Sequence, residues 1–238
     1  MEGQEKPSTS IKREPTGIQG LDEALQGGLP PGVVTLVTGT SGSGKTTLSM
    51  QFLVYGAKHG EKGIYFTLEE SPEDIIEQFE IFDPSIRELI ASNMLKVVEV
   101  PIVDYESLKE TVLSESEAMD AKRIVIDSIN YFQMFFPDVI SIRRAIMEVS
   151  MMLKSRHSIG ILIGEIPSGE NKLSTFGVEE FATDGVIALY LLEKQGTFTR
   201  AIRIVKMRNT NHITKFMPLD ITPKGIVVYP TAELFQDV

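Results

Sequence analysis

The sequence predicts an α/β fold: a mostly parallel β-sheet flanked by helices, with an antiparallel extension towards the C-terminus. Apolar runs alternate with helical patterns through the first two thirds of the chain. These runs are apolar at every position, which is typical of parallel strands covered on both faces. In the last third, strand-like runs follow one another without helices between them, which indicates antiparallel pairing. A length of 238 residues suits one such domain.

The elements follow in chain order from these patterns. Residues 1–12 carry Pro, Ser, Thr and mixed charge without apolar periodicity, so we expect a flexible tail followed by one domain over residues 13–238. A helix is expected to open at Ser71, an N-cap residue followed by Pro and two acids. The other expected helices are Lys45–Lys58, Tyr105–Met119 and Ile140–Arg156. The expected strands are Val33–Thr38, Gly63–Leu68, Leu95–Val100, Arg123–Asp127, Ile159–Gly164, Val186–Leu192, Thr199–Met207 and Gly225–Tyr229, with a turn at Glu193–Thr197.

Composition excludes several classes of protein. The chain has no cysteine, which removes disulfides, zinc–thiolate sites, iron–sulfur clusters and thiol nucleophiles. Its 33 acidic and 23 basic residues give a net charge of −10, which argues against nucleic acid as a partner. No apolar run approaches the roughly 20 residues needed to cross a bilayer. The N-terminus shows no apolar signal segment, so we expect a cytoplasmic protein without a membrane partner.

The strongest motif directly follows the first predicted strand. It reads Gly39-Thr40-Ser41-Gly42-Ser43-Gly44-Lys45-Thr46 and fits the Walker A pattern G-x-x-x-x-G-K-[ST] of a P-loop. Glycines allow successive backbone N–H groups to point at phosphate oxygens, Lys45 supplies charge to the β and γ phosphates, and the Thr46 hydroxyl is a Mg²⁺ ligand. We also place Thr47 among the nucleotide-binding residues. The alternative is a glycine-rich turn, but a strand before the loop and a helix after it favour a site for ATP and Mg²⁺.

Acidic residues follow two other predicted strands. Asp127 ends an apolar strand, where a carboxylate can hold Mg²⁺ through water. Alone this signal is weak, because buried strands often end in Asp, but the phosphate loop strengthens it. Glu69 and Glu70 follow the strand before Ser71 and would lie near the phosphates, where one of them could orient and deprotonate a water. The alternative is that both acids begin a solvated loop.

Taken together, the chain resembles the KaiC family of the RecA-type ATPase superfamily. The segments that carry this resemblance are residues 16–23, 27–30, 67–76, 126–128, 177–181, 184–186, 206–212 and 221–226, together with the phosphate loop. The resemblance implies a RecA-type P-loop NTPase core that assembles as a homo-oligomeric ring, usually a hexamer, with ATP between subunits. It also implies that Lys206 and Arg208 reach the γ-phosphate of the neighbouring subunit's nucleotide, and that Glu69 is the base. Asn209 departs from the family, which usually has Gly there, but Asn tolerates a left-handed turn.

A basic stretch supports this assignment. Between Glu193 and Asp220 the chain has no acidic residue. By strand alternation, Arg200, Lys206 and Arg208 share one face and Arg203 takes the other. We expect Arg200 and Arg203 to protect an exposed edge strand, and Lys206 and Arg208 to serve the shared site. His212 either contacts nucleotide or satisfies a local backbone group.

Three functions remain open from the sequence. The favoured one is a KaiC-like ring protein that binds ATP, hydrolyses it slowly and regulates an unidentified protein partner. The second is a regulatory or scaffold module that binds nucleotide with negligible turnover. The third, a recombinase acting on DNA, is disfavoured because the loop Pro167–Thr175 contains one Lys and one Glu, not a basic glycine-rich run. The aromatic cluster Tyr131, Phe132, Phe135 and Phe136 belongs either to the core or to a subunit interface.

Overall fold

A computed structural model describes residues 12–167, 172–194 and 196–234, and most of the predicted tail (residues 1–11) lies outside them. Within these residues, nine strands form one sheet in the order β3-β2-β4-β5-β1-β6-β7-β8-β9. Strands β1 to β6 pair in parallel, whereas β6 to β9 pair antiparallel. The predicted fold class is therefore confirmed. The strands are β1 (Val34–Gly39), β2 (Gly63–Thr67), β3 (Leu95–Glu99), β4 (Arg123–Asp127), β5 (Ile159–Glu165), β6 (Gly185–Lys194), β7 (Thr197–Met207), β8 (Met217–Thr222) and β9 (Gly225–Val228).

The long helices also lie where the sequence places them. Ser71 is the N-cap of α3, and its hydroxyl accepts a hydrogen bond from the backbone N–H of Asp74. The short helices α1, α4, η1 and α7 were not predicted, because four to six residues carry too little helical periodicity. Strand β8 was not predicted because it contains Pro218 and Asp220, which are rare in strands. The helices are α1 (Leu21–Ala24), α2 (Lys45–Lys58), α3 (Pro72–Glu80), α4 (Ile86–Ala91), α5 (Tyr105–Met119), the 3₁₀ helix η1 (Ile129–Met134), α6 (Val139–Ser155) and α7 (Glu179–Ala182). No described helix is long and apolar enough to span a membrane.

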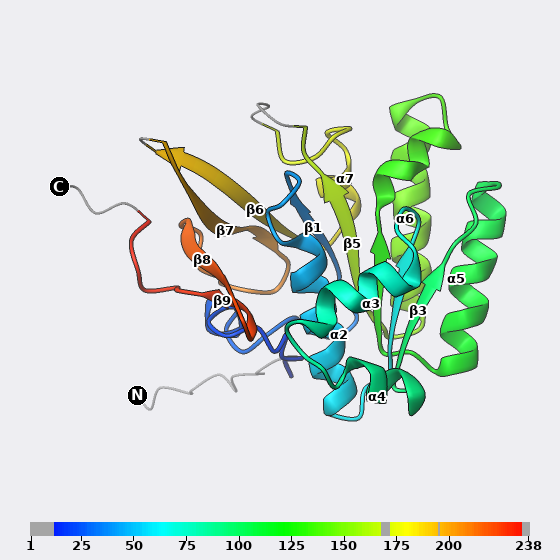
Figure 1. The fold of residues 1–238 in the computed structure, drawn as a ribbon. Helices are drawn as coiled ribbons and strands as arrows, with labels where there is room; N and C mark the ends of the chain where they lie inside the picture. Colours follow the sequence, from blue (N-terminus) through cyan, green and yellow to red (C-terminus); the bar gives the residue numbers. More distant parts are fainter. Residues whose placement is uncertain (1–11, 168–171, 195, 235–238) are drawn as a thin grey trace, which may run out of the picture.

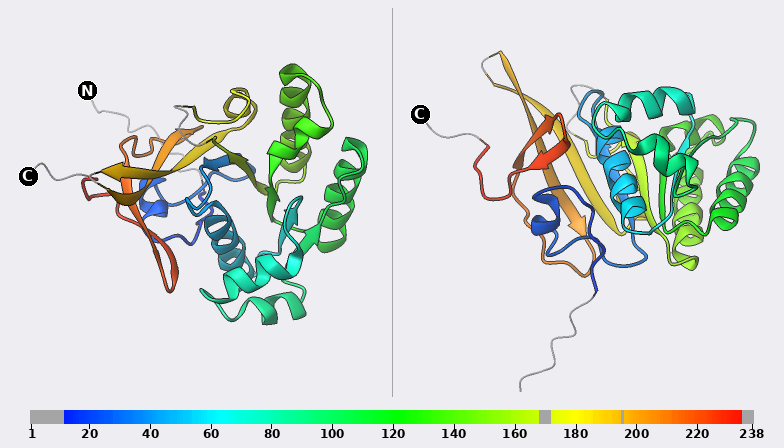
Figure 2. Two further views of the ribbon diagram at one scale, coloured as in Figure 1. Left: turned by 45° about the horizontal axis from the view of Figure 1, so that its top comes forward. Right: turned by 60° about the horizontal axis from the view of Figure 1, so that its bottom comes forward.

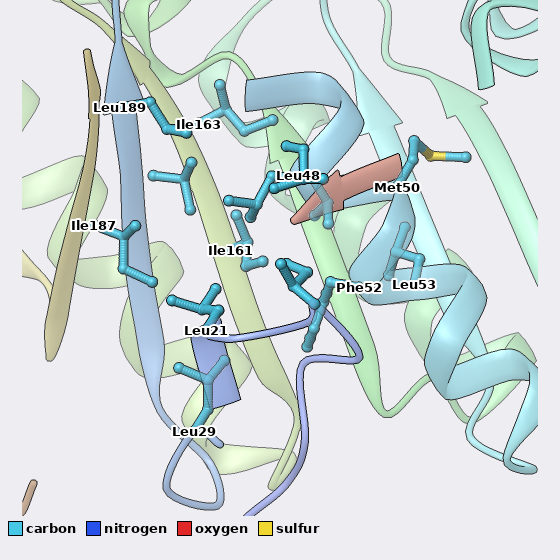
Figure 3. Packing of buried hydrophobic residues seen from close by; sticks show 14 of the residues in the cluster. Leu21, Leu29, Leu48, Met50, Phe52, Leu53, Ile161, Ile163, Ile187 and Leu189 are labelled. Atoms are coloured by element: carbon cyan, nitrogen blue, oxygen red, sulfur yellow. The ribbon is translucent and has the colours of Figure 1, made fainter. Parts of the chain in front are cut away.

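The sheet separates two hydrophobic clusters. One cluster joins α1 to α4 with one face of the strands and with β8 and β9, and the other joins α5, η1 and α6 with the opposite face. Figure 1 shows α5 at one side of the molecule and the β6–β9 extension at the other. Both views of Figure 2 keep the orange and red C-terminal strands apart from the green helices α5 and α6. In Figure 3, Leu48 of α2 lies near Ile161 and Ile163 of β5 in the first cluster.

The register of the parallel strands brings the candidate site residues to one end of the sheet. Gly39 pairs with Glu165 of β5, and Thr67 pairs with Asp127 of β4. The phosphate loop, the turn after β2 and the ends of β4 and β5 therefore meet at the carboxyl ends of the parallel strands, where ligands bind in open α/β sheets.

Two expectations about the basic stretch are wrong. β7 lies between β6 and β8, so it is not an edge strand. Its pairing with β6 passes from Ile187–Ile204 directly to Val186–Lys206, which is a β-bulge. An extra residue in one strand moves each later side chain to the face of the sheet opposite to the one that strict alternation predicts. Lys206 therefore does not share the face of Arg200, although the two have the same sequence parity.

The aromatic cluster belongs mainly to the core. Phe132 is completely buried, and Tyr131, Phe135 and Phe136 pack partly buried against the cluster beneath α5 and α6. The Tyr105 ring meets Phe132 and Phe136 edge to face at centroid distances of 5.7 and 5.0 Å. Such pairs stabilise a core beyond the area they bury.

Candidate nucleotide-binding site

A cavity of about 370 Å³ opens at the carboxyl ends of the parallel strands. Its lining comes from the phosphate loop, the turn after β2, the ends of β4 and β5, and single residues of α3 and β8. It gathers most of the residues that the sequence singled out. The lining residues are Ser41, Gly42, Gly44, Lys45, Thr46, Thr47, Glu69, Glu70, Gln78, Asp127, Glu165 and Ile221.

Glycine is required at two positions of the loop. Gly44, the N-cap of α2, has φ 104°, a conformation that L side chains rarely adopt. A Cβ on Gly39 would lie 2.6 Å from both the Leu189 carbonyl oxygen and Ser43 Oγ. The loop can therefore lie against β6 and turn into α2 only with these glycines. Within the described residues, Ser43 Oγ is buried and has no hydrogen-bond partner.

Lys45 lies across the mouth of this loop. It is only 8% exposed, and its ammonium donates to the Thr40 carbonyl oxygen at 3.1 Å. Among the described residues, the nearest carboxylate oxygen is Glu165 Oε1, which lies 3.8 Å from Lys45 Nζ, and the Glu165 side chain is half exposed. A buried ammonium with one close backbone acceptor and one distant carboxylate is held in place for an anion that would share the cavity.

Asp127 lies in the same cavity beside Tyr65. The fully buried Tyr65 hydroxyl donates a hydrogen bond to Asp127 Oδ2. Burial raises the pKa of Asp127 to about 6, and the charges of Glu69 and Glu70 act in the same direction, whereas the Tyr65 hydrogen bond and Lys45 oppose the rise. Such a carboxylate favours a cationic partner, because a cation offsets the cost of burying its charge.

Thr67 shapes the turn that carries the two acids. Its hydroxyl accepts from the backbone N–H groups of Glu69 (3.3 Å) and Glu70 (3.1 Å) and donates to the Glu70 carbonyl oxygen (2.8 Å). The Glu70 carboxylate accepts a hydrogen bond from Gln78 of α3. Within the described chain, the Glu69 carboxylate makes no hydrogen bond. Burial and the neighbouring charges of Glu165 and Glu70 raise the pKa of Glu69. The two acids therefore have different environments, and Glu69 is the one suited to accept a proton.

The residues present fit ATP and Mg²⁺. The unpartnered Ser43 hydroxyl, the glycine loop and the buried Lys45 ammonium form a cradle for an anion. The expected metal ligands are the Thr46 hydroxyl and the Asp127 carboxylate, both of which line the cavity. No group of three acidic or histidine side chains among the described residues could hold a metal by itself. This suits Mg²⁺, which usually takes one or two protein ligands and completes its shell with phosphate oxygens and water.

Three lining residues were not predicted from the sequence: Gln78, Glu165 and Ile221. Tyr65, which lies behind Asp127 and donates to it, was not predicted either. Glu165 carried a usable signal, because it follows an apolar strand as Asp127 does. Tyr65 also stands out as a hydroxyl-bearing residue within the apolar strand β2. Gln78 and Ile221 gave no signal, because they reach the cavity only through the packing of α3 and β8.

Three predicted residues lie elsewhere. Met207 and Thr35 both pair with Gly185 of β6, so the end of β7 and the start of β1 lie at the same end of the sheet, on either side of β6, whereas the phosphate loop follows the other end of β1. Lys206 and Arg208 therefore lie at the end of the sheet opposite to the cavity of their own chain. His212 Nδ1 lies 3.1 Å from the neighbouring Ile213 carbonyl oxygen, which agrees with a local backbone role. Asn209 has φ 56°, so the expected left-handed turn is confirmed.

Arg200, in contrast, lies near the cavity. Its Nε donates to the carbonyl oxygen of Gly42 at 3.3 Å. Arg200 therefore contacts the phosphate loop of its own chain instead of protecting an edge strand.

Comparison with known proteins agrees with this architecture. A family model described as "ATPase: KaiC" matches residues 14–233. The circadian clock oscillator protein KaiC of Nostoc sp. strain PCC 7120 is 36% identical over 244 residues, which cover 96% of this chain and 47% of the relative. The chain thus spans about half the length of the KaiC proteins it matches.

Shorter relatives match over nearly their full length. A UPF0273 protein of Pyrococcus furiosus is 32% identical over 237 residues, which cover 92% of this chain and 95% of the relative. The crystal structure of a KaiC-like protein from Pyrococcus horikoshii OT3 has a TM-score of 0.85 and 36% identity, and the match covers 93% of this chain and all of that one. The fold, the phosphate loop and these matches agree: the chain belongs to the KaiC family of ATPases.

Proposed function

We propose that this protein hydrolyses ATP at sites shared between identical subunits of a ring. Each site would take its phosphate loop, Glu69 and Asp127 from one subunit and Arg208, with Lys206, from the next. The observation that carries this proposal is that these two groups of residues lie at opposite ends of the strands of one sheet. In a head-to-tail contact between copies, the end of the sheet that carries the phosphate loop in one subunit would face the end that carries Lys206 and Arg208 in its neighbour. Head-to-tail contacts of this kind generate rings.

The surface around Arg208 supports such a contact. Met147, Met151 and Phe181 are exposed and line the same cavity as Arg208. Exposed apolar side chains beside an arginine are typical of protein interfaces. The Arg208 side chain is itself 59% exposed. An arginine supplied by a neighbouring molecule stabilises the charge on a transferring phosphoryl group.

Turnover is favoured over simple binding because the cavity holds a candidate base. The Glu69 carboxylate is free of hydrogen bonds within the described chain, lines the cavity with Lys45 and has a raised pKa. In the proposed reaction, Glu69 would orient a water and accept its proton as the water oxygen attacks the γ-phosphorus and the bond to the leaving ADP breaks. Lys45 would bind the β and γ phosphates, and Thr46 and Asp127 would hold Mg²⁺, whose charge offsets that of the phosphates. Slow turnover, a ring of six and a regulated protein partner rest on the family resemblance.

Mixing two inactive variants tests the shared site. Lys45→Ala removes the phosphate-binding ammonium, and Arg208→Ala removes the guanidinium supplied to the neighbour. In a random equal mixture, about one quarter of the interfaces would combine an intact loop with an intact arginine, so about one quarter of the wild-type ATPase rate should return. Lys45→Ala mixed with the double variant Lys45→Ala/Arg208→Ala is the control, because no interface then has an intact loop.

Sedimentation with and without ATP completes the test. We expect assemblies larger than a monomer under at least one condition. If both variants are oligomeric and their mixture stays inactive, the shared site is refuted. A wild-type protein that binds ATP but is monomeric and shows no turnover would instead support the nucleotide-binding module.

A further inference from the structure

The segment Thr183–Asp184, between α7 and β6, holds both basic side chains of the proposed shared site. Lys206 Nζ donates to the carbonyl oxygens of Thr183 (2.6 Å) and Glu180 (3.0 Å). Arg208 Nη1 donates to Asp184 Oδ1 at 3.0 Å, and the Arg208 backbone N–H donates to the Asp184 carbonyl oxygen at 3.1 Å. Two consecutive residues thus bind both cations.

Asp184 is itself fixed more firmly than Arg208. It is 4% exposed, and its Oδ1 accepts a second hydrogen bond from Lys154 Nζ at 2.9 Å. Its Oδ2 accepts from the Val34 backbone N–H at 3.2 Å, and its own backbone N–H donates to the Val34 carbonyl oxygen at 2.8 Å. Asp184 is therefore anchored to the start of β1, the strand that ends in the phosphate loop.

Arg208 is held at one point only. Among the described residues, Asp184 is the only hydrogen-bond partner of the Arg208 guanidinium, and Nη1 is the only nitrogen engaged. The remaining N–H groups stay available to an acceptor outside the chain. Arg208, Asp184 and Lys154 also line two neighbouring cavities, of about 150 and 340 Å³, so there is open space beside the guanidinium.

Lys206 differs from Arg208 in this respect. Two backbone carbonyls occupy its ammonium, and burial together with the charge of Arg208 lowers the pKa of Lys206. The geometry favours Arg208 as the side chain that extends to a phosphate, with Lys206 holding the segment that carries Asp184.

We infer that Asp184 is a positioning residue for Arg208 in the neighbour's ATP site, and that Lys154 supports it by fixing the shared oxygen, Asp184 Oδ1. This inference rests on the proposed function. A carboxylate that binds one nitrogen of a guanidinium limits its rotation, so the other nitrogens reach the γ-phosphate without first losing side-chain entropy. Asp184 would then affect the neighbour's site and leave the site of its own chain intact.

The full-length variant Asp184→Asn tests this directly. We expect kcat to fall about tenfold with little change in KM for ATP, because the loss concerns the transition state. Mixed with Lys45→Ala, it should recover about one quarter of the wild-type rate, as Arg208→Ala does. The double variant Asp184→Asn/Arg208→Ala should be no slower than Arg208→Ala alone, because Asp184 acts through Arg208. A merely structural role would impair the variant's own loop and prevent recovery on mixing.

Glu117→Gln is the matched control. Glu117 Oε1 pairs with Arg156 Nη1 at 2.8 Å, so this variant removes a carboxylate from a similar arginine pair on the exposed surface of α5. We expect its kcat to equal that of the wild type.

Lys154→Met keeps the inference testable if Asp184→Asn does not fold. It leaves the Arg208–Asp184 pair intact and removes one anchor of Asp184, so kcat should fall about threefold. In an equal mixture with Lys45→Ala, half of the intact loops would face an unaltered arginine, so the rate per Lys154→Met subunit should about double, which is the recovery expected here. Three results would overturn the inference: wild-type kcat in Asp184→Asn, wild-type kcat in Lys154→Met, or absence of recovery on mixing while Arg208→Ala does recover. Absence of recovery with Arg208→Ala itself removes the shared site and, with it, the role of Asp184.

Discussion

Removing the Tyr65 hydroxyl should weaken Mg²⁺ binding without disturbing the fold. In Tyr65→Phe, the partly buried Asp127 carboxylate loses the donor that fixes Oδ2 and favours its charged form. A hydrogen bond to a charged group contributes about 1.5–3 kcal/mol, which corresponds to roughly 10- to 100-fold in affinity. Loss of a group that orients a metal ligand typically has the same effect. We therefore expect the Mg²⁺ concentration for half-maximal ATPase activity, at fixed ATP, to rise roughly 10- to 100-fold.

Tyr105→Phe is the matched control for this experiment. The Tyr105 hydroxyl is also buried, but it donates to the Ala145 carbonyl oxygen at 2.8 Å, beneath α6 and away from the cavity. Both variants should lose about 1 kcal/mol of unfolding free energy, measured by urea titration. Only Tyr65→Phe should shift the Mg²⁺ midpoint. An unchanged midpoint in Tyr65→Phe would refute the assignment of Asp127 to the metal.

Three further predictions concern the cap, the loop and pH. Ser71→Ala should cost about 1 kcal/mol in urea unfolding, because the α3 N-cap is lost, whereas Ser114→Ala within α5 should cost almost nothing. Gly44→Ala forces an alanine to φ 104° and places its Cβ 3.2 Å from Ile221, so calorimetry should show ATP affinity reduced at least tenfold. Burial alone would raise the pKa of Asp184, but the hydrogen bonds from Lys154 and the Val34 N–H, with the charge of Arg208, hold it below the ordinary 3.8. The stability this contributes is present above about pH 4 and is lost as pH falls through the folded pKa, so wild-type urea midpoints should fall more steeply below pH 4 than those of Asp184→Asn.

Local sequence accounts for much of the candidate site. The phosphate loop is readable because a positive φ at Gly44 and close packing at Gly39 leave no other residue type, and because a strand and a helix must flank it. Asp127 and Glu69 were readable from their position at the ends of apolar strands. Glu165 shares that position and lies beside Lys45. It was missed because a single acid after a strand is ordinary unless the sheet order is known.

The basic residues show where local patterns fail. The parity of Arg200 and Lys206 suggested one face, but the bulge in β7 separates them, and a bulge is a property of two paired strands, not of one. The edge assigned to β7 was wrong for a related reason: β8 has a proline and an aspartate within six residues, and only its pairing with β9 and β7 identifies it as a strand.

The sequence by itself determined the strand–helix alternation, the phosphate loop and the family, because each depends on spacing within short segments. Only the tertiary structure decided which carboxylates meet Lys45, that Tyr65 donates to Asp127, and that Asp184 joins Lys154 to Arg208. Those contacts link residues 24 to 120 positions apart in the chain. They exist because parallel register and antiparallel return bring distant segments together, and no periodicity within one segment encodes that proximity.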